Sequence, residues 1–137
     1  MAGPDHLISK MEKALRLSGN THTVSDVFNA LREGHMQAFW NETSVVITEV
    51  ANTPRRKFVS VFLVAGDLDG VMGLHNQIAD WAKSNRYDFA RIVVRPGFVK
   101  LLERNGWKKR QIMMELDLHG WWWTKHCNEQ DRATPVA

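Results

Sequence analysis

A glycine-rich, acidic turn, GDLDGVMGL, at residues 66–74 is a candidate for binding an anionic ligand. It places three glycines and two carboxylates at the start of a predicted helix: Gly66, Gly70, Gly73, Asp67 and Asp69. Backbone N–H groups at the start of a helix can bind an anion, and a glycine lets the anion come close. The two aspartates instead complement the helix dipole themselves. At roughly 5 Å and an effective dielectric constant of about 20, each would oppose a phosphate by about 3 kcal/mol.

Two histidines and the single cysteine, His119, His126 and Cys127, could ligate a metal ion. They lack a fourth partner and a recognised spacing, so the sequence predicts no metal site. Because one cysteine cannot form an internal disulfide, the chain fits a reducing compartment or a particle assembled in one.

Three consecutive tryptophans near the C-terminus are the strongest candidates for binding a partner. Neighbouring side chains on a strand alternate faces, so Trp121, Trp122 and Trp123 cannot all enter one core. Tryptophan is also enriched among the residues that dominate protein interfaces. Two interpretations stay open: the tail docks on another molecule, or it folds back and shields the edge of its own sheet.

Two basic clusters could contact an acidic partner: Arg55 and Arg56 in the turn 54–57, and residues 108–110 beside Trp107. Most such clusters are merely solvated. No aromatic pattern of an RNA-binding kind accompanies them, and the net charge is only +3. The sequence therefore favours a protein partner over a nucleic acid.

The composition indicates one folded, soluble domain. The chain has 137 residues, of which 44% are hydrophobic and 24% charged, so it is too short for two ordinary domains. The longest apolar run, Phe58 to Gly66, is far shorter than the roughly 20 residues of a membrane-spanning helix. The N-terminal segment lacks the apolar core of a signal peptide. We therefore expect no membrane span.

Hydrophobic periodicity predicts a single domain over residues 1–118 and a Trp-rich tail over 119–137. Within the domain, residues 4–34 form a helical N-terminal part, because apolar side chains recur there at helical spacing in two segments. Either Thr23 or Ser25 can cap the second of these helices.

Over residues 36–118 the spacing of the apolar side chains differs from that of the N-terminal part, and it predicts a sheet with two helices. The elements follow in this order: strands 36–40, 44–51 and 57–66, helix 68–85, strand 88–94, helix 96–105 and strand 107–118. Three consecutive strands favour an antiparallel meander, and the helix between the third and fourth strands favours a parallel crossover. We therefore expect an α/β (α+β) fold, a mixed sheet with helices on both faces.

This order of elements resembles the GNAT (GCN5-related N-acetyltransferase) fold with its usual first strand missing, over about Ser25 to Leu118. The matching stretches are SDVFNALREGHMQAFW, VVITEVANTPRRKFVSV, IADWAKSN and RPGFVKLLERNGWKK. More narrowly, the sequence is similar to the short GNAT-like proteins of tailed bacteriophages. Six residues match their pattern around the last helix: Arg95, Gly97, Phe98, Leu101, Gly106 and Trp107.

The resemblance implies that an active member would hold acetyl-CoA at the glycine-rich turn. In the family, backbone N–H groups of this turn bind the CoA pyrophosphate, usually after an arginine or glutamine. The corresponding residues here would be Ala65, Gly66, Gly70 and Gly73. No register gives both glycines at the family spacing with a basic or amide residue in front, so the turn departs from the family pattern.

The residues that would carry the reaction are also altered. Many members use a tyrosine of the last helix as the general acid, and that position falls on Leu102, which cannot donate a proton. The only tyrosine, Tyr87, precedes the fourth strand. Glu49, on the predicted strand 44–51, is the best candidate for a general base, although an outward-facing surface glutamate explains it as well.

The sequence therefore predicts a non-catalytic GNAT-like bacteriophage protein, either virion-associated or a head or tail assembly factor, without a catalytic residue or cofactor. Its partners would be other phage structural proteins of the portal, neck or tail, or a second copy of itself. It would reside in the virion or the host cytoplasm. The alternative is an acetyl-CoA-dependent N-acetyltransferase with a degenerate CoA turn and Glu49 as the base. A third interpretation is an inhibitor that binds a host enzyme.

Overall fold

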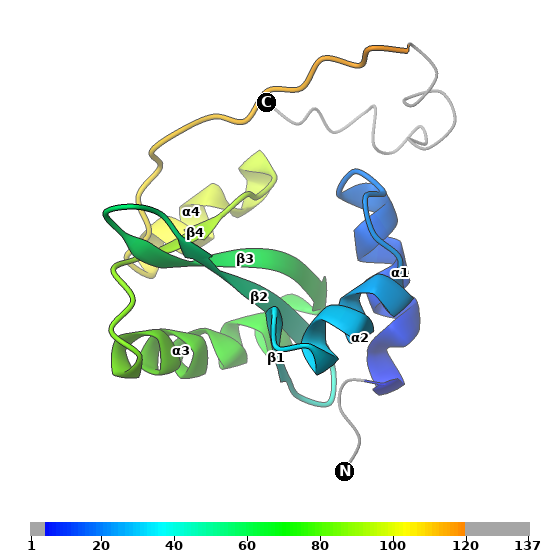
Figure 1. The fold of residues 1–137 in the computed structure, drawn as a ribbon, viewed down its shortest axis with the longest axis horizontal. Helices are drawn as coiled ribbons and strands as arrows, with labels where there is room; N and C mark the ends of the chain where they lie inside the picture. The colour runs from blue at the N-terminus through cyan, green and yellow to red at the C-terminus, as the bar shows by residue number, and fades with distance from the viewer. Residues whose placement is uncertain (1–4, 120–137) are drawn as a thin grey trace. The chain divides into compact units, whose positions relative to one another are not determined.

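The computed structural model describes residues 5–119, and its contacts divide the chain into two compact units, Met1–Ile92 and Val93–Ala137. The first unit contains η1 (Asp5–Leu7), α1 (Ile8–Leu17), α2 (Val24–Arg32), β1 (Met36–Trp40), β2 (Ser44–Asn52), β3 (Lys57–Gly66), α3 (Leu68–Ser84) and β4 (Ala90–Ile92) (Figure 1). The second contains η2 (Pro96–Phe98) and α4 (Val99–Arg104).

The first unit is built on a four-stranded mixed sheet in the order β1-β2-β3-β4. The first three strands are antiparallel, and β4 runs parallel to β3 after the α3 crossover, which confirms the predicted meander and crossover. The register shifts between Ile47, opposite Leu63, and Thr48, opposite Val61. Phe62 is therefore the extra residue of a β-bulge in β3.

Helices cover both faces of this sheet, as predicted (Figure 1). On one face α1 and α2 enclose a core that includes Leu7, Met11, Leu15, Val27, Val45, Ile47 and Leu63. On the other face α3 packs on Phe39 and Val46 through Leu74, Ile78 and Trp81. The four-residue spacing of the α1 side chains puts them on one side of the helix. Fully burying such a side chain contributes roughly 1.5–3 kcal/mol.

Helix α2 begins at a reciprocal pair of hydrogen bonds. The Thr23 side chain accepts from the Asp26 N–H at 3.1 Å, and the Asp26 carboxylate accepts from the Thr23 N–H at 2.8 Å. Of the two predicted caps, Thr23 is the one that acts, because its extended backbone directs the hydroxyl at the third N–H of the helix.

The second unit contains the predicted last helix in a shortened form. It begins as a 3₁₀ turn at Pro96 and becomes α-helical from Val99 to Arg104. The Trp107 N–H donates to the Leu102 carbonyl at 3.1 Å, and Gly106 between them has a φ of +96°. Only glycine adopts that conformation without strain, so Gly106 ends the helix as predicted.

The predicted final strand, 107–118, is wrong. From Trp107 to His119 the described backbone belongs to no helix or strand. Alternating side chains are a local property, whereas a strand also needs a neighbour that accepts and donates its backbone hydrogen bonds. In the described chain this segment has no such neighbour, so the sheet predicted within 36–118 ends at Ile92.

Among residues 5–119, no helix combines the length and the apolar character needed to cross a bilayer. Trp121, Trp122, Trp123, His126 and Cys127 lie outside the described residues.

Candidate functional site

At the start of helix α3, the chain itself binds the Gly70 N–H. Asp67 is the N-cap, and its carboxylate accepts a hydrogen bond from the Gly70 N–H at 2.6 Å. The Asp67 carbonyl accepts from the Val71 N–H at 3.0 Å. N–H groups in the first turn of a helix have no partner within the helix, and here a carboxylate takes the place of an external anion. The interpretation of Asp67 as an ordinary helix-start residue is confirmed.

The turn between β1 and β2 closes over the same helix start. The Ser44 hydroxyl donates to the Asp67 carbonyl at 3.0 Å, and the Thr43 hydroxyl donates to the Asp67 carboxylate at 3.3 Å. The Asn41 amide donates to the Gly70 carbonyl at 2.9 Å. Ser44 is fully buried, so the contact is tightly packed.

Two glycines of the candidate cofactor turn are explained by this contact. A Cβ atom at Gly70 would lie 2.2 Å from both the Ser44 and the Thr43 side-chain oxygens. Gly66 has a φ of +117°, and its Cβ would lie 2.3 Å from the Thr43 carbonyl. The absent side chains therefore make room for the chain's own β1–β2 turn.

The other two candidate cofactor residues are placed differently. Gly73 lies on α3, where a Cβ would find the Asn41 amide nitrogen at 3.9 Å, an ordinary contact. Ala65 is buried in β3 opposite Val45. Gly66 and Gly70 thus flank the start of α3, and of the three glycines Gly73 alone has room for a side chain.

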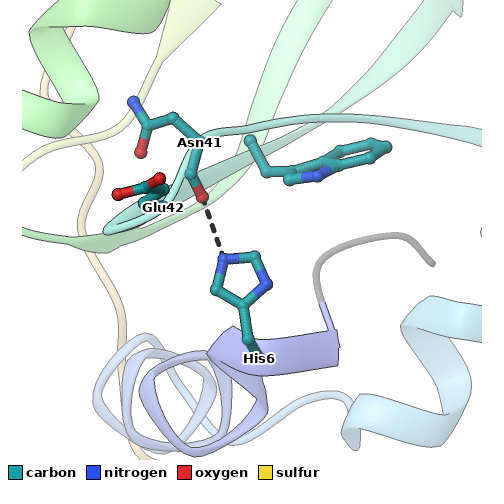
Figure 2. A pocket seen from close by; sticks show the side chains of 4 residues that line it. His6, Asn41 and Glu42 are labelled. Carbon is teal, nitrogen blue, oxygen red and sulfur yellow. Dashed lines mark hydrogen bonds between the residues drawn. The ribbon is translucent and has the colours of Figure 1, made fainter. Parts of the chain in front are cut away.

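The β1–β2 turn is held from its other side by the N-terminal helices. The His6 Nε2 atom lies 3.0 Å from the Asn41 carbonyl oxygen (Figure 2), and the Lys10 ammonium donates to the Thr43 carbonyl at 3.0 Å. His6, Trp40, Asn41 and Glu42 line an open pocket of about 450 Å³ beside this contact. No local pattern in the sequence predicts this contact, because more than 30 residues separate the partners.

Glu49 lies on β2, five residues from Ser44, and is half-buried. At about 3.3 Å per residue, the two positions are separated by about 17 Å along the strand. Its neighbours across the sheet are Met36 on β1 and Ser60 on β3, on the face covered by α1 and α2. The structure therefore does not bring the candidate base to the start of α3.

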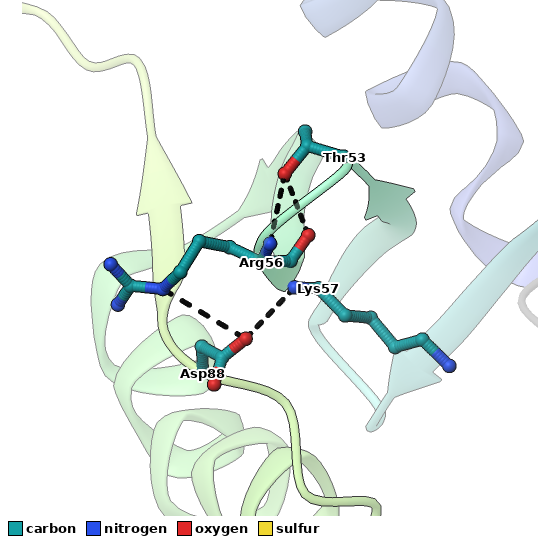
Figure 3. Close-up of polar contacts among 4 residues, drawn as sticks. All are labelled: Thr53, Arg56, Lys57 and Asp88. Atoms are coloured by element: carbon teal, nitrogen blue, oxygen red, sulfur yellow. Dashed lines mark hydrogen bonds and ion pairs between the residues drawn. The ribbon is translucent and has the colours of Figure 1, made fainter.

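The predicted interaction residues Arg55 and Arg56 are exposed in the β2–β3 turn. The Asp88 carboxylate accepts from the Lys57 N–H at 2.8 Å and lies 3.9 Å from Arg56 Nε (Figure 3). Thr53 closes the turn through hydrogen bonds with the backbone of Arg56 (Figure 3).

Two phenylalanine rings lie beside this basic turn, and no local pattern in the sequence predicts their position. The Phe58 and Phe89 rings stack at 4.5 Å, and Arg56 lies over Phe89 at 5.0 Å. Arg91 lies over Phe58 at 4.5 Å and over Phe89 at 5.4 Å. We name Arg56, Arg91, Phe58 and Phe89 the arginine–aromatic cluster. The parallel pairing of β3 with β4 creates it from residues about 30 positions apart.

Tyr87 packs edge-on against Trp81 at 5.4 Å, and Leu102 is half-buried on α4. Trp107 is half-buried in the second unit, where it lines an open pocket of about 530 Å³ with residues 108–110. Within residues 5–119 no three side chains of His, Cys, Asp or Glu gather as a metal-binding group.

The comparisons with known proteins identify the fold. No family model matches the sequence, and no curated protein matches it. The structure is similar to a GCN5-related N-acetyltransferase from Ralstonia eutropha, with a TM-score of 0.63, 14% identity, and coverage of 85% of this chain and 95% of that one. It is also similar to an acetyltransferase from Trypanosoma brucei, with a TM-score of 0.59, 13% identity, and coverage of 80% and 94%. The chain therefore has a GNAT-like fold.

Proposed function

We propose that this chain is a non-catalytic GNAT-like protein that acts by binding other proteins. The observation that carries the proposal is the packing of the chain against Gly70 at the start of α3. The Asp67 carboxylate holds the Gly70 N–H, and Thr43 and Ser44 fill the space beside Gly70.

Binding a pyrophosphate at the Gly70 N–H would require the Asp67 cap to withdraw and Thr43 and Ser44 to move from beside Gly70. Loss of an N-cap typically costs about 1 kcal/mol, and each hydrogen bond lost from the turn about 1 kcal/mol more. The displaced carboxylate would then stand next to the phosphates and oppose them. A catalytic role also lacks a proton donor, because Leu102 stands where the resemblance places the general acid.

The partner class that we propose is a structural protein of a tailed bacteriophage, in the portal, neck or tail. This part of the proposal rests on the resemblance of the sequence between Arg95 and Lys109 to phage GNAT-like proteins. The consecutive tryptophans at 121–123 and the exposed Arg55 and Arg56 are the residues that we expect to contact the partner. The protein would then act in the virion or in the cytoplasm of the host.

The experiment compares the full chain with a truncation after Leu118 for association with purified phage particles. Loss of association in the truncated chain, with unchanged thermal unfolding, supports docking through the Trp-rich tail. Equal association of both chains contradicts that role. Absence of the full chain from particles contradicts the virion assignment.

The second candidate is an acetyl-CoA-dependent N-acetyltransferase, with Glu49 as the base. It is supported by the structural neighbours from Ralstonia eutropha and Trypanosoma brucei, which are described as acetyltransferases. Acetyl transfer to an amine panel would support this candidate if Glu49→Gln abolished the transfer. The matched control is Glu42→Gln, an exposed carboxylate in the β1–β2 turn.

A further inference from the structure

The β1–β2 turn binds elements from both faces of the sheet at once. Helix α1 packs on one face and helix α3 on the other, and the turn joins β1 to β2 at one end of the sheet. Two turn residues, Asn41 and Thr43, make this double contact. Each binds the N-terminal helices through its backbone carbonyl and the start of α3 through its side chain.

On the N-terminal side, two side chains of one helical run hold the two carbonyls. The His6 Nε2 atom lies 3.0 Å from the Asn41 carbonyl oxygen, as Figure 2 shows, and the Lys10 ammonium lies 3.0 Å from the Thr43 carbonyl oxygen. Residues four apart in a helix project from the same side, so His6 and Lys10 reach the turn together.

On the other side, the contacts of the turn converge on Asp67 and Gly70. The Asn41 carboxamide donates to the Gly70 carbonyl at 2.9 Å. The hydroxyls of Thr43 and Ser44 donate to the carboxylate and the carbonyl of Asp67, at 3.3 and 3.0 Å. The same Asp67 carboxylate accepts from the Gly70 N–H.

Hydrogen bonds within the turn tie its two sides together. The Asn41 side-chain oxygen accepts from the N–H groups of Thr43 and Ser44, at 3.1 and 2.9 Å. The Asn41 N–H donates to the Ser44 carbonyl at 3.0 Å, which closes a loop of only two residues. A movement of the carbonyls that face α1 therefore also moves the side chains that bind α3.

We propose that the β1–β2 turn is a conformational relay, which couples residues 6–10 to the start of α3. While His6 and Lys10 hold the carbonyls, the turn stays against Asp67 and the Gly70 N–H stays bonded. When they release the carbonyls, the turn moves away from α3 and the Gly70 N–H opens more often. Coupling of this kind is reciprocal, so a change at either end is felt at the other.

The relay lies within the first unit, and every residue that it uses belongs to Met1–Ile92. The inference goes beyond the proposed function, since it depends neither on a phage partner nor on whether acetyl-CoA binds. Its test therefore needs no ligand.

The test compares two exposed lysines of α1 in the full-length chain. Lys10→Ala removes the donor to the Thr43 carbonyl, and Lys13→Ala, three residues further along the same helix, is the matched control. In Lys10→Ala the Gly70 amide should exchange its hydrogen about three- to fivefold faster by NMR, the change expected from losing one hydrogen bond. Lys13→Ala should change this rate by less than about twofold, and equal rates in the two variants would overturn the proposal.

A second control separates the relay from a general loss of stability. Val27→Ala removes packing from a fully buried position on α2, outside the relay, and so weakens the whole fold. The exchange rate of Gly70 should nevertheless stay within about twofold of the wild type. If it rises as much as in Lys10→Ala, Gly70 reports global stability and the relay is refuted.

Two further variants test the path through the turn. In a Thr43→Val background, Lys10→Ala should accelerate Gly70 exchange by less than about twofold, because the hydroxyl that passes the movement to Asp67 is already gone. Effects that simply multiply would contradict this path.

The reciprocal experiment starts from the α3 side. Ser44→Ala removes the hydrogen bond to the Asp67 carbonyl, and it should shift the imidazole NMR signals of His6. The signals of the exposed His35 should stay in place and serve as the control. Unmoved His6 signals, or equal shifts of the two histidines, would overturn the proposed coupling.

Discussion

Replacement of Gly70 by alanine tests the packing at the start of α3. The added Cβ would lie 2.2 Å from the side-chain oxygens of Thr43 and Ser44, closer than real contacts allow. Both side chains must move, and the movement breaks the Ser44 hydrogen bond to the Asp67 carbonyl and the Thr43 hydrogen bond to the Asp67 carboxylate. Two hydrogen bonds and an overpacked contact together cost about 2–4 kcal/mol.

Alanine also favours a helix over glycine by about 1 kcal/mol, which offsets part of this loss. The expected net destabilisation is therefore about 2 kcal/mol, or a melting temperature lower by roughly 5–10 °C. Urea unfolding followed by circular dichroism measures it. The matched control is Gly73→Ala, whose Cβ meets its nearest atom at 3.9 Å, so this variant should be more stable than the wild type by up to about 1 kcal/mol.

The prediction is that Gly70→Ala lowers the free energy of unfolding, whereas Gly73→Ala raises it. In a Ser44→Ala background the loss caused by Gly70→Ala should shrink by at least about 0.5 kcal/mol, because one of the two clashing oxygens is gone. If Gly70→Ala is as stable as Gly73→Ala, the β1–β2 turn does not pack on the start of α3, and the glycine remains available to a ligand.

Three further predictions follow from the fold of the first unit. Met11→Ala, at a fully buried position, should cost about 2–5 kcal/mol in urea unfolding, whereas the exposed Lys13→Ala should change stability little; equal values would contradict the assigned helix face. Thr48→Val should cost about 1 kcal/mol, because the buried hydroxyl donates to the Gln37 side chain at 2.9 Å; an unchanged midpoint would contradict this bond. The backbone N–H of Thr23, then its side chain, holds the pKa of Asp26 below its ordinary value of 3.8. The Asp26 cap therefore stabilises the fold fully above that value and less as the pH falls through the lower pKa of the folded state. The difference in the free energy of unfolding between the wild type and Asp26→Asn should therefore vanish in acid.

Local pattern predicted most of the first unit. The alternating and apolar runs of β1 and β3 and the turns between them gave strands whose ends match the structure, 36–40 and 57–66. Gly106 was recognisable as a helix stop, because a glycine after a leucine-rich turn commonly adopts a positive φ. Such features depend on neighbours in the sequence, which is why the sequence alone suffices for them.

The errors and omissions concern contacts between distant residues. The pattern of 107–118 predicts a strand, but no local feature can supply the strand that pairs with it. The glycines of residues 66–70 predict that another group packs closely against this turn, but they do not identify the group. In the structure it is Thr43 and Ser44, more than 20 residues earlier. The arginine–aromatic cluster was missed for the same reason, since only the pairing of β3 with β4 brings Arg91 to Phe58.

Titration of acetyl-CoA into the full-length protein by calorimetry tests the central claim most directly. Because Asp67 holds the Gly70 N–H and Thr43 and Ser44 pack beside Gly70, we expect no saturable binding with a dissociation constant below about 1 mM, equivalent to about −4 kcal/mol. Gly73→Arg serves as the control, since this position has room for a side chain beside the turn. Saturable binding at micromolar concentrations that Gly73→Arg abolishes would contradict the account.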